Sequence, residues 1–175
     1  MKMAKTSEKQ VLLDEIKVLN ALEQHSKDGI DEIAKSCSFS RQKISRIIKN
    51  LEQSKVIWGY TAITDEDVRN LKQFVLIVKR KSVPFDEAYK KELIFDKLDS
   101  YSSDVKIENI SLTHGQYDGF VTFYAKDIIY AKKLVNEIFK RIGKYFEEYI
   151  MLETLFPIRK QGLKNPKMKK LVEYL

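Results

Sequence analysis

A run of polar and basic side chains between Ser40 and Lys49 offers the clearest binding chemistry in this 175-residue chain. Its members can donate hydrogen bonds to base edges and to phosphate oxygens: Arg41, Gln42, Lys43, Ser45, Arg46 and Lys49. Arginine can bond to two acceptors of guanine, and glutamine can bond to adenine in the same two-point manner. Ser40 is a natural helix N-cap, and the free amides that open a helix can bind a phosphate oxygen. These residues predict a DNA-binding surface; the alternative is the solvated polar face of an ordinary helical bundle.

Three short helices are expected to position this run. Apolar residues recur at helical spacing over about residues 8–26, 30–37 and 41–53. The side chains expected to lie inside are Leu12, Ile16, Leu19, Leu22, Ile30, Ile33, Ala34, Ile44, Ile47, Ile48 and Leu51. The third helix would pack through its apolar face and present its polar face, as the second helix of a helix-turn-helix does in the major groove. A strand is expected next, over Val56–Ile63, and residues 1–63 form the predicted DNA-binding domain.

The pattern changes after a polar linker at residues 64–72. The elements expected beyond it are a strand at Phe74–Lys79, a helix at 85–101, strands at Val105–Thr113 and Tyr117–Ala125, a helix at 128–142 and a strand at Phe146–Phe156. This β-α-β-β-α-β order is that of the ferredoxin-like split arrangement. The apolar phase slips between Ile107 and Ile110, which predicts a β-bulge. Residues 73–160 are therefore expected to form an α/β domain, which a basic helix or tail follows at residues 161–175.

Both halves of the chain resemble the Lrp/AsnC (feast/famine) family of transcriptional regulators. The stretch IDEIAKSCSFSRQKISRIIKNLEQSKVIWGYTAITD is similar to the family's winged helix-turn-helix. The stretch HGQYDGFVTFYAKD is similar to the G-x-Y-D loop and the next strand of its regulatory domain. The resemblance covers about residues 8–160 and implies an α+β fold: a winged helix-turn-helix followed by a ferredoxin-like, RAM-type domain. It also implies double-stranded DNA as a partner, an amino acid as effector, and homodimers that often build tetramers or octamers.

Two glycines of the family pattern are replaced in this chain. Ser38 stands in the turn before the third helix, and Lys55 stands before the predicted wing. Glycine relieves the strain of a left-handed backbone, whereas another residue holds that conformation at a cost of about 1 kcal/mol. The fold is expected to tolerate both replacements. Glu15 also stands where the family usually has Asp.

The loop between the two central strands of the second domain is the candidate effector site. It comprises His114, Gly115, Gln116, Tyr117 and Asp118. Glycine lets a backbone approach a small molecule closely, Asp118 can accept a hydrogen bond from an ammonium group, and loop amides can donate to a carboxylate. These groups suit an amino acid, in agreement with the resemblance. The alternative is a turn in which Asp118 only accepts hydrogen bonds from backbone amides.

Charge and composition limit the other functions. The chain carries a net charge of +7, which divides into +3 over residues 1–60, −1 over 61–157 and +5 over 158–175. Basic ends favour phosphate binding, with solvated lysines as the alternative. The single cysteine, Cys37, is expected in the core, and the two histidines lack metal-ligand spacing. No metal, cofactor or catalytic residue is predicted. Because no signal-like or membrane-spanning stretch is found, the protein is expected to be cytoplasmic.

The basic tail has two interpretations. Its lysines, Lys164, Lys167, Lys169 and Lys170, can contact phosphates as an arm. Alternatively, the tail docks through Met168, Leu171, Val172 and Leu175, whose spacing favours docking.

Two other functions fit a similar architecture. Sirohaem decarboxylases resemble this family and use histidines near the strand turn, where His114 lies, but they usually lose the basic recognition face that this chain keeps. The other alternative is a ligand-binding oligomer with a vestigial DNA module. Salt-sensitive binding to a DNA duplex distinguishes the regulator from both. The strands at Phe74–Val78 and Phe120–Tyr124 carry large apolar side chains on both faces, which predicts a homodimer that covers the sheet.

Overall fold

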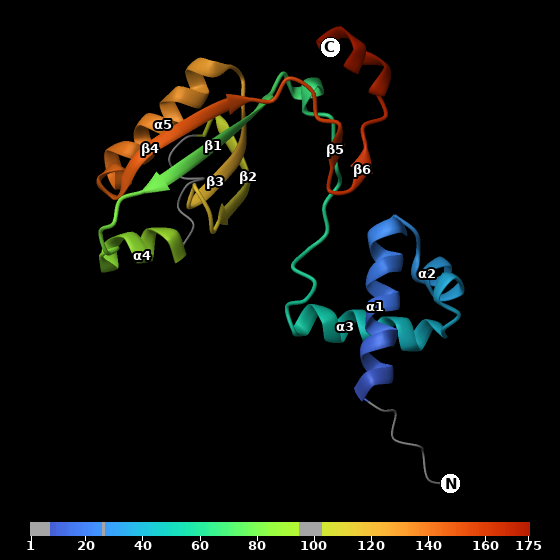
Figure 1. Ribbon diagram of the computed structural model, residues 1–175. Coiled ribbons are helices and arrows are strands. Elements are labelled where there is room, and N and C mark those ends of the chain that lie inside the picture. The colour runs from blue at the N-terminus through green and yellow to red at the C-terminus, as the bar shows by residue number, and fades with distance from the viewer. Residues whose placement is uncertain (1–7, 26, 95–102) are drawn as a thin grey trace. The chain divides into compact units, whose positions relative to one another are not determined.

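A computed structural model of the protein describes residues 8–25, 27–94 and 103–175. The chain divides into two compact units, Met1–Ala62 and Ile63–Leu175 (Figure 1). The first unit is helical, and the second is a four-stranded sheet with helices. The predicted α+β class, with a helix-turn-helix before a ferredoxin-like domain, is confirmed. None of the helices in the described part of the chain is long and apolar enough to cross a membrane.

Three helices enclose the core of the N-terminal unit. They are α1 (Glu8–His25), α2 (Ile30–Cys37) and α3 (Arg41–Gln53). The buried side chains come from all three helices: Val18, Ala21, Ile33, Ala34, Cys37, Ile44, Ile47 and Leu51. Burying a valine, leucine or isoleucine side chain contributes roughly 1.5–3 kcal/mol. Cys37 is a fully buried core residue, as predicted.

Part of the predicted core is wrong. Leu12 and Ile16 are 56% and 43% exposed, and Ile30 is 37% exposed, whereas Val18 and Ala21 are buried. An 18-residue helix such as α1 is about 27 Å long, whereas the eight residues of α2 span about 12 Å. The partner helices leave the N-terminal end of α1 uncovered, because residues 8–13 are all exposed.

In the N-terminal unit, two residues other than glycine hold a left-handed backbone after α-helices. Ser38 follows α2 with φ 55°, and Lys55 follows α3 with φ 61°. These are the two positions where the family pattern has glycine, and the fold accommodates both replacements as expected. At the first corner the amides of Ser38 and Phe39 bond to the carbonyls of Lys35 and Ala34 at 3.0 and 2.9 Å. These bonds end α2 and turn the chain toward α3.

The strand predicted over Val56–Ile63 is wrong for the single chain. No strand lies between Gln53 and Lys72. A strand needs a second strand to accept and donate its ladder of hydrogen bonds, and the described part of the N-terminal unit contains only helices. Trp58 is 95% exposed within this segment. The wing of the helix-turn-helix is therefore not formed.

The second unit has the predicted order of elements. The strands of its main sheet are β1 (Lys72–Arg80), β2 (Val105–Leu112), β3 (Gly119–Ala125) and β4 (Phe146–Glu153). The α-helices are α4 (Glu87–Ile94), after β1, and α5 (Ile128–Ile142), after β3. Short 3-10 helices precede β1 and β4: η1 (Glu66–Arg69) and η3 (Gly143–Tyr145).

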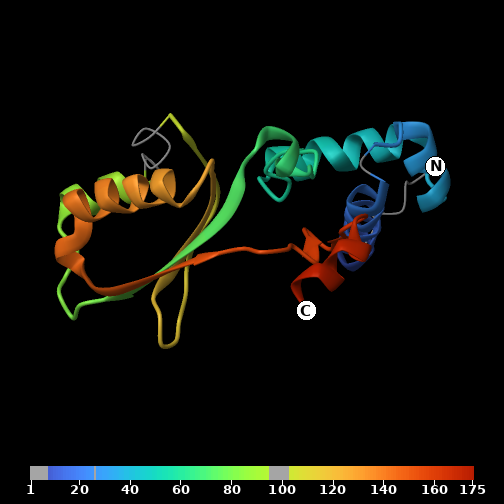
Figure 2. The ribbon, with the colours of Figure 1, turned by 90° about the horizontal axis from the view of Figure 1, so that it is seen from above.

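The sheet is antiparallel throughout, with strand order β2-β3-β1-β4. The bulge predicted between Ile107 and Ile110 is confirmed, because the register of β2 against β3 shifts between Ile107 and Asn109. Both α-helices lie on the same side of the sheet (Figure 2). The helix predicted over 85–101 is described as far as Ile94, and its remainder lies largely outside the described residues.

α5 covers one face of the sheet with its apolar side. The buried residues of this core are Phe74, Leu76, Val121, Phe123, Ala125, Ala131, Leu134, Val135 and Ile138. Because side chains alternate along a strand, their neighbours point to the opposite face. That open face carries Val75, Ile77, Phe120, Thr122, Ile150 and Leu152. These side chains are only partly buried or exposed, so the single chain leaves an apolar sheet surface uncovered.

The C-terminal tail folds back onto the start of the second unit. It contains the two-stranded pair β5 (Arg159–Lys160) and β6 (Leu163–Lys164) and the 3-10 helix η4 (Met168–Tyr174). Val172 and Leu175 are 76% and 97% exposed, so the prediction that they anchor the tail is wrong.

Lysines anchor the tail instead of these apolar residues. Lys160 Nζ donates to the carbonyl of Thr64 at 3.2 Å, and Lys167 pairs with the carboxylate of Asp65. The rings of Phe156 and Tyr174 also pack together, with their centres 5.7 Å apart. The tail is therefore held to residues 64–65, and part of its positive charge is neutralised there.

Candidate nucleic-acid interface and effector loop

α3 presents a stripe of exposed polar side chains. Spacings of three and four residues place its members along one side of the helix: Gln42, Ser45, Arg46 and Lys49. None of the four side chains has a hydrogen-bonding or ionic partner among the described residues. The opposite side of α3 buries Ile44, Ile47 and Leu51 in the core. One face thus anchors the helix while the other is free, which is what a recognition helix requires.

Lys43 stands apart from this stripe. Its Nζ lies 2.5 Å from Oδ2 of Asp14 in α1 and 3.7 Å from the centre of the Phe39 ring. Asp14 is only 9% exposed, and it also accepts a hydrogen bond from Gln10. The hydrogen bond from Lys43 lowers the pKa of the Asp14 carboxyl. Lys43 therefore joins α3 to α1, and its charge is already neutralised within the unit.

The first residues of α3 combine capping with exposed charge. Ser40 Oγ accepts a hydrogen bond from the Lys43 amide at 3.2 Å, which confirms the predicted N-cap. Arg41 Nη1 lies 3.6 Å from Oδ2 of Asp31, and both side chains are exposed. Such a surface pair contributes at most about 1 kcal/mol, so Arg41 can exchange Asp31 for a phosphate.

The structure adds two residues to those that the sequence singled out. Asp14 and Asp31 are the acidic partners of Lys43 and Arg41. They lie on other helices, so no spacing within α3 connects them with their partners. Opposite charge within the same domain was the only signal for either pair.

Asp118 connects the loop at residues 114–118, the candidate effector site, to β1. Its Oδ2 accepts a hydrogen bond from the Arg80 amide at 2.7 Å, and its own amide donates to the Val78 carbonyl at 3.0 Å. The Thr113 amide donates to the Asp118 carbonyl at 2.9 Å. These bonds match the alternative in which the aspartate satisfies backbone amides. Oδ1 is the Asp118 oxygen without a hydrogen-bonding partner among the described residues.

The remaining loop residues lie largely in solvent. His114, Gly115 and Gln116 are exposed, and the hydroxyl of half-buried Tyr117 donates to Glu148 at 3.4 Å. Gly115 has φ 156°, and a Cβ placed there would meet open space, so glycine serves the backbone conformation at this position. The loop is thus accessible, with its free groups facing water.

Comparison with known proteins bears on the fold. No family model and no curated protein matches the sequence. PH0061, a solved structure, is 25% identical with a TM-score of 0.65, over 90% of this chain and 97% of that one. An AsnC family transcriptional regulator from Agrobacterium tumefaciens is 18% identical with a TM-score of 0.65, over 89% and 97%. The transcriptional regulator NMB0573 from Neisseria meningitidis, solved with L-Met, is 15% identical with a TM-score of 0.64, over 89% and 97%.

A helix-turn-helix unit followed by a β-α-β-β-α-β domain defines a class of two-unit proteins. This chain has the fold of the Lrp/AsnC transcriptional regulators, so the resemblance seen in the sequence is confirmed at the level of structure. The Agrobacterium and Neisseria proteins are described as transcriptional regulators and not as enzymes.

Proposed function

We propose that the protein is a sequence-specific, DNA-binding transcriptional regulator without enzymatic activity. The observation that carries this proposal is the free polar stripe on α3, whose other face is buried in the helical core. A stable helix with exposed arginine, glutamine and lysine can enter the major groove and reach base edges. The chain's net charge of +7 adds attraction to the phosphate backbone.

The residues of α3 divide into three roles in this proposal. Arg46 and Gln42 read bases, because their side chains make two-point contacts with guanine and adenine. Ser45, Lys49 and Arg41 contact bases or phosphates, and the amides at Ser40 and Arg41 receive a phosphate oxygen at the start of the helix. Lys43 pairs with Asp14 and so holds α3 against α1.

The functional unit is proposed to be a homodimer, which can assemble further into tetramers or octamers. The open sheet face carries apolar side chains from β1, β3 and β4. Pairing two such faces removes them from water and gives two recognition helices a fixed spacing. A DNA site with two half-sites, about one helical turn or a multiple apart, follows from that symmetry.

An amino acid is the proposed effector, bound at residues 114–118. Asp118 Oδ1 and the exposed amides of this loop can receive an ammonium and a carboxylate group. The neighbour from Neisseria was solved with L-Met, which supports this class of ligand. The test uses Asp118→Asn, which keeps an acceptor for the Arg80 amide but removes the charge. A ligand at the loop should bind the wild type and lose affinity for Asp118→Asn.

Selection of bound DNA tests the proposal as a whole. The full chain is mixed with fragments of its source genome, including the fragment upstream of its own gene, and bound fragments are sequenced. A regulator should enrich a small set that shares a two-fold symmetric motif. A vestigial DNA module should enrich nothing, and a sirohaem decarboxylase should instead take up sirohaem and show haem-type absorbance.

A further inference from the structure

A tight turn closes a basic β-hairpin in the C-terminal tail. β5 and β6 pair antiparallel on either side of Gln161 and Gly162 (Figure 1). Both turn residues have positive φ angles, 46° and 81°, which match the turn to the twist of the two strands. Asn165 closes the other end, because its amide donates to the Ile158 carbonyl at 3.0 Å and its Nδ2 donates to the Pro157 carbonyl at 2.8 Å. The hairpin is therefore preformed.

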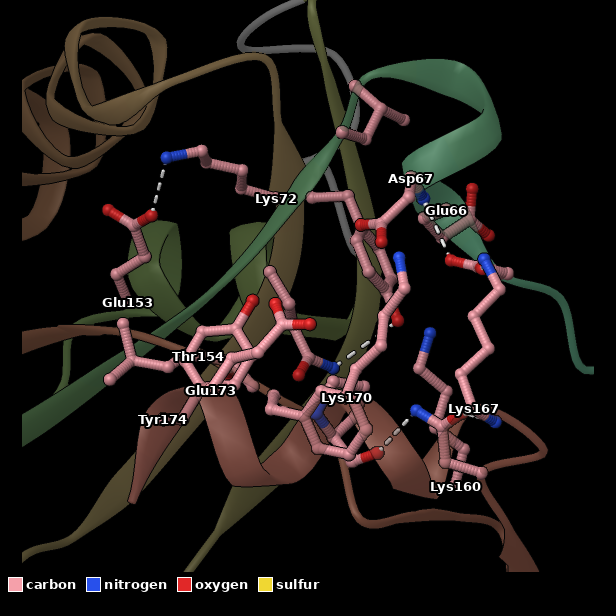
Figure 3. Close-up of a pocket in the computed structure, with 18 residues that line it drawn as sticks. Glu66, Asp67, Lys72, Glu153, Thr154, Lys160, Lys167, Lys170, Glu173 and Tyr174 are labelled. Carbon is pink, nitrogen blue, oxygen red and sulfur yellow. Dashed lines mark hydrogen bonds and ion pairs between the residues drawn. The ribbon is translucent and has the colours of Figure 1, made fainter.

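One face of the hairpin is docked onto the second unit. Lys160 Nζ donates to the Thr64 carbonyl at 3.2 Å and lies 5.1 Å from the centre of the Tyr124 ring. Figure 3 shows Lys160 and Lys167 extending from the tail toward the side where Glu66 lies, and both lysines line the cavity drawn there. The charges of these two lysines thus hold the tail in place.

The opposite face carries two cations side by side. Arg159 and Lys164 are directly opposed across the ladder, so their side chains project from the same face, away from that of Lys160. Both side chains are exposed, and neither has an ionic partner in the part of the chain that the structure describes. Nη1 of Arg159 donates to the Gly162 carbonyl at 2.7 Å, which orients the guanidinium without neutralising it.

This arrangement favours the binding of an anion. Like charges at directly opposed positions destabilise a pair of strands, so Arg159 and Lys164 weaken the isolated hairpin. An anion between them replaces repulsion with charge-assisted hydrogen bonds. The planar guanidinium can bond to two oxygens of one phosphate, and the lysine adds a point charge beside it. The pair therefore suits a phosphate group.

The surroundings of the pair favour a polymer of phosphates over a free phosphate ion. Both side chains project into solvent, where a single ion would keep most of its contacts with water. Residues 158–175 carry a net charge of +5, so attraction extends beyond these two side chains. A polyanion gains affinity from such a surface because its condensed counterions are released.

We propose that the β5–β6 hairpin binds the phosphate backbone of duplex DNA through Arg159 and Lys164. This inference rests on the proposed function and adds to it a contact outside α3. Phosphate contacts carry no sequence information, so the hairpin strengthens binding to every duplex alike. Lys160 and Lys167 keep their contacts within the protein and hold the hairpin in place.

Salt titrations of DNA binding by the full chain test the hairpin. Fluorescence anisotropy compares a duplex from the genomic selection with a scrambled duplex of equal length. Arg159→Gln and Lys164→Gln should each lower the slope of log K against log salt by about one. Both variants should weaken the two duplexes about equally, whereas Arg46→Ala should weaken the selected duplex only.

Lys164→Glu separates loss of binding from damage to the fold. It places opposite charges across the ladder, so it should raise Tm by about 1–3 °C. The new carboxylate also repels phosphate, so DNA binding should fall further than in Lys164→Gln. A solvated pair of cations without a role in binding would give the rise in Tm but no change in DNA affinity, and that result would overturn the proposal.

Lys167→Gln is the matched control. It removes the same charge from the same tail, but Asp65 already neutralises Lys167, so the slope should stay as in the wild type. An equal loss of slope in this control would reduce the effect to net charge and overturn the hairpin site.

Inorganic phosphate distinguishes DNA from a free ion. At the same ionic strength as a chloride buffer it should leave Tm unchanged. A rise in Tm that Arg159→Gln abolishes would make the hairpin a free-phosphate site instead. A wild type that binds no duplex would overturn the proposed regulator together with the hairpin site. Unchanged slopes in both hairpin variants, with the effect of Arg46→Ala intact, would overturn the hairpin site alone.

Discussion

Two lysines of α3 carry the same charge but have different environments. Lys43 is paired with the nearly buried Asp14, whereas Lys49 is exposed and has no partner among the described residues. A lysine that binds a phosphate releases a counterion, so its loss lowers the slope of log K against log salt by about one. Lys49→Ala should show that change in DNA-binding titrations at several salt concentrations.

Lys43→Ala should behave in the opposite way. Its removal leaves the Asp14 carboxylate without its main partner, so the free energy of unfolding should fall by about 1–3 kcal/mol. The salt slope of DNA binding should stay as in the wild type. An equal loss of slope in both variants would mean that Lys43 leaves Asp14 when DNA binds.

Glu66 is a nearly buried carboxyl whose pKa is strongly lowered. It is 5% exposed and accepts hydrogen bonds from Thr64, Lys106 and Arg69 at 2.8, 3.0 and 2.8 Å. Burial alone would raise the pKa of Glu66, but these hydrogen bonds outweigh it and lower the pKa from 4.5 to about 2. The folded state therefore favours the ionised carboxylate.

The pH dependence of stability follows from this lowered pKa. The contribution of Glu66 is fully present above pH 4.5 and is lost as the pH falls toward about 2. Glu66→Gln should lower the free energy of unfolding by about 1–3 kcal/mol at pH 7, and the difference from the wild type should shrink between pH 5 and 2. Urea unfolding at several pH values measures it, and a difference that is constant with pH would contradict the assignment.

The corner between α2 and α3 stores a small backbone strain. Ser38 holds φ 55° there, a conformation that costs an ordinary residue roughly 1–2 kcal/mol and glycine almost nothing. Ser38→Gly should therefore raise the free energy of unfolding by about 0.5–1 kcal/mol, because part of the relief is lost to the freer unfolded chain.

Ser36→Gly is the matched control for this change. Ser36 lies inside α2, where glycine is a poorer helix former than serine, so the variant should be destabilised by roughly 0.5 kcal/mol. Thermal or denaturant unfolding measures whether each variant raises or lowers the free energy of unfolding. Destabilisation by Ser38→Gly would show that its left-handed backbone is not under strain.

Local patterns predicted most elements, because their causes lie close together in the sequence. The turn with Ser38, the cap at Ser40 and the slip between Ile107 and Ile110 each depend on neighbouring residues, and each is found in the structure. The exposure of Leu12 depends on how far α2 and α3 reach along α1, which spacing within α1 cannot reveal. The segment Val56–Ile63 has strand-like composition but lacks a strand to pair with in its own unit.

Contacts between residues that lie far apart in the chain could not be predicted from the sequence either. Lys43 and Asp14 are separated by most of the helical unit, and Lys167 meets Asp65 across about a hundred residues. Apolar spacing favoured docking of the tail through Met168, Leu171, Val172 and Leu175. Val172 and Leu175 are exposed, and contacts of Lys160 and Lys167 hold the tail. The candidate base readers were found because they follow one another on a single helix.

At the scale of the whole molecule, the open sheet face predicts dimerisation. Ile77 lies at the centre of this face, on β1 between β3 and β4. Ile77→Asp should place a charge in the dimer interface and shift the protein toward the monomer, as measured by light scattering with size-exclusion chromatography. Burying an unpaired carboxylate is costly enough to separate two such faces.

Ile129→Asp is the control for this change. Ile129 is an isoleucine of α5 that is 62% exposed, on the helical side of the unit. It should leave the dimer intact. A wild-type protein that is monomeric at micromolar concentration, or equal dissociation of the two variants, would contradict the proposed interface.

Discrimination between two DNA duplexes tests the central claim most directly. Fluorescence anisotropy compares the best duplex from the genomic selection with a scrambled duplex of equal length and composition, for the wild type and Arg46→Ala. The wild type should bind the selected duplex at least ~10³-fold more tightly, and Arg46→Ala should lose about 1–3 kcal/mol on that duplex only. Equal affinity of the wild type for both duplexes, or an affinity for the selected duplex that Arg46→Ala leaves unchanged, would contradict a regulator that reads DNA through α3.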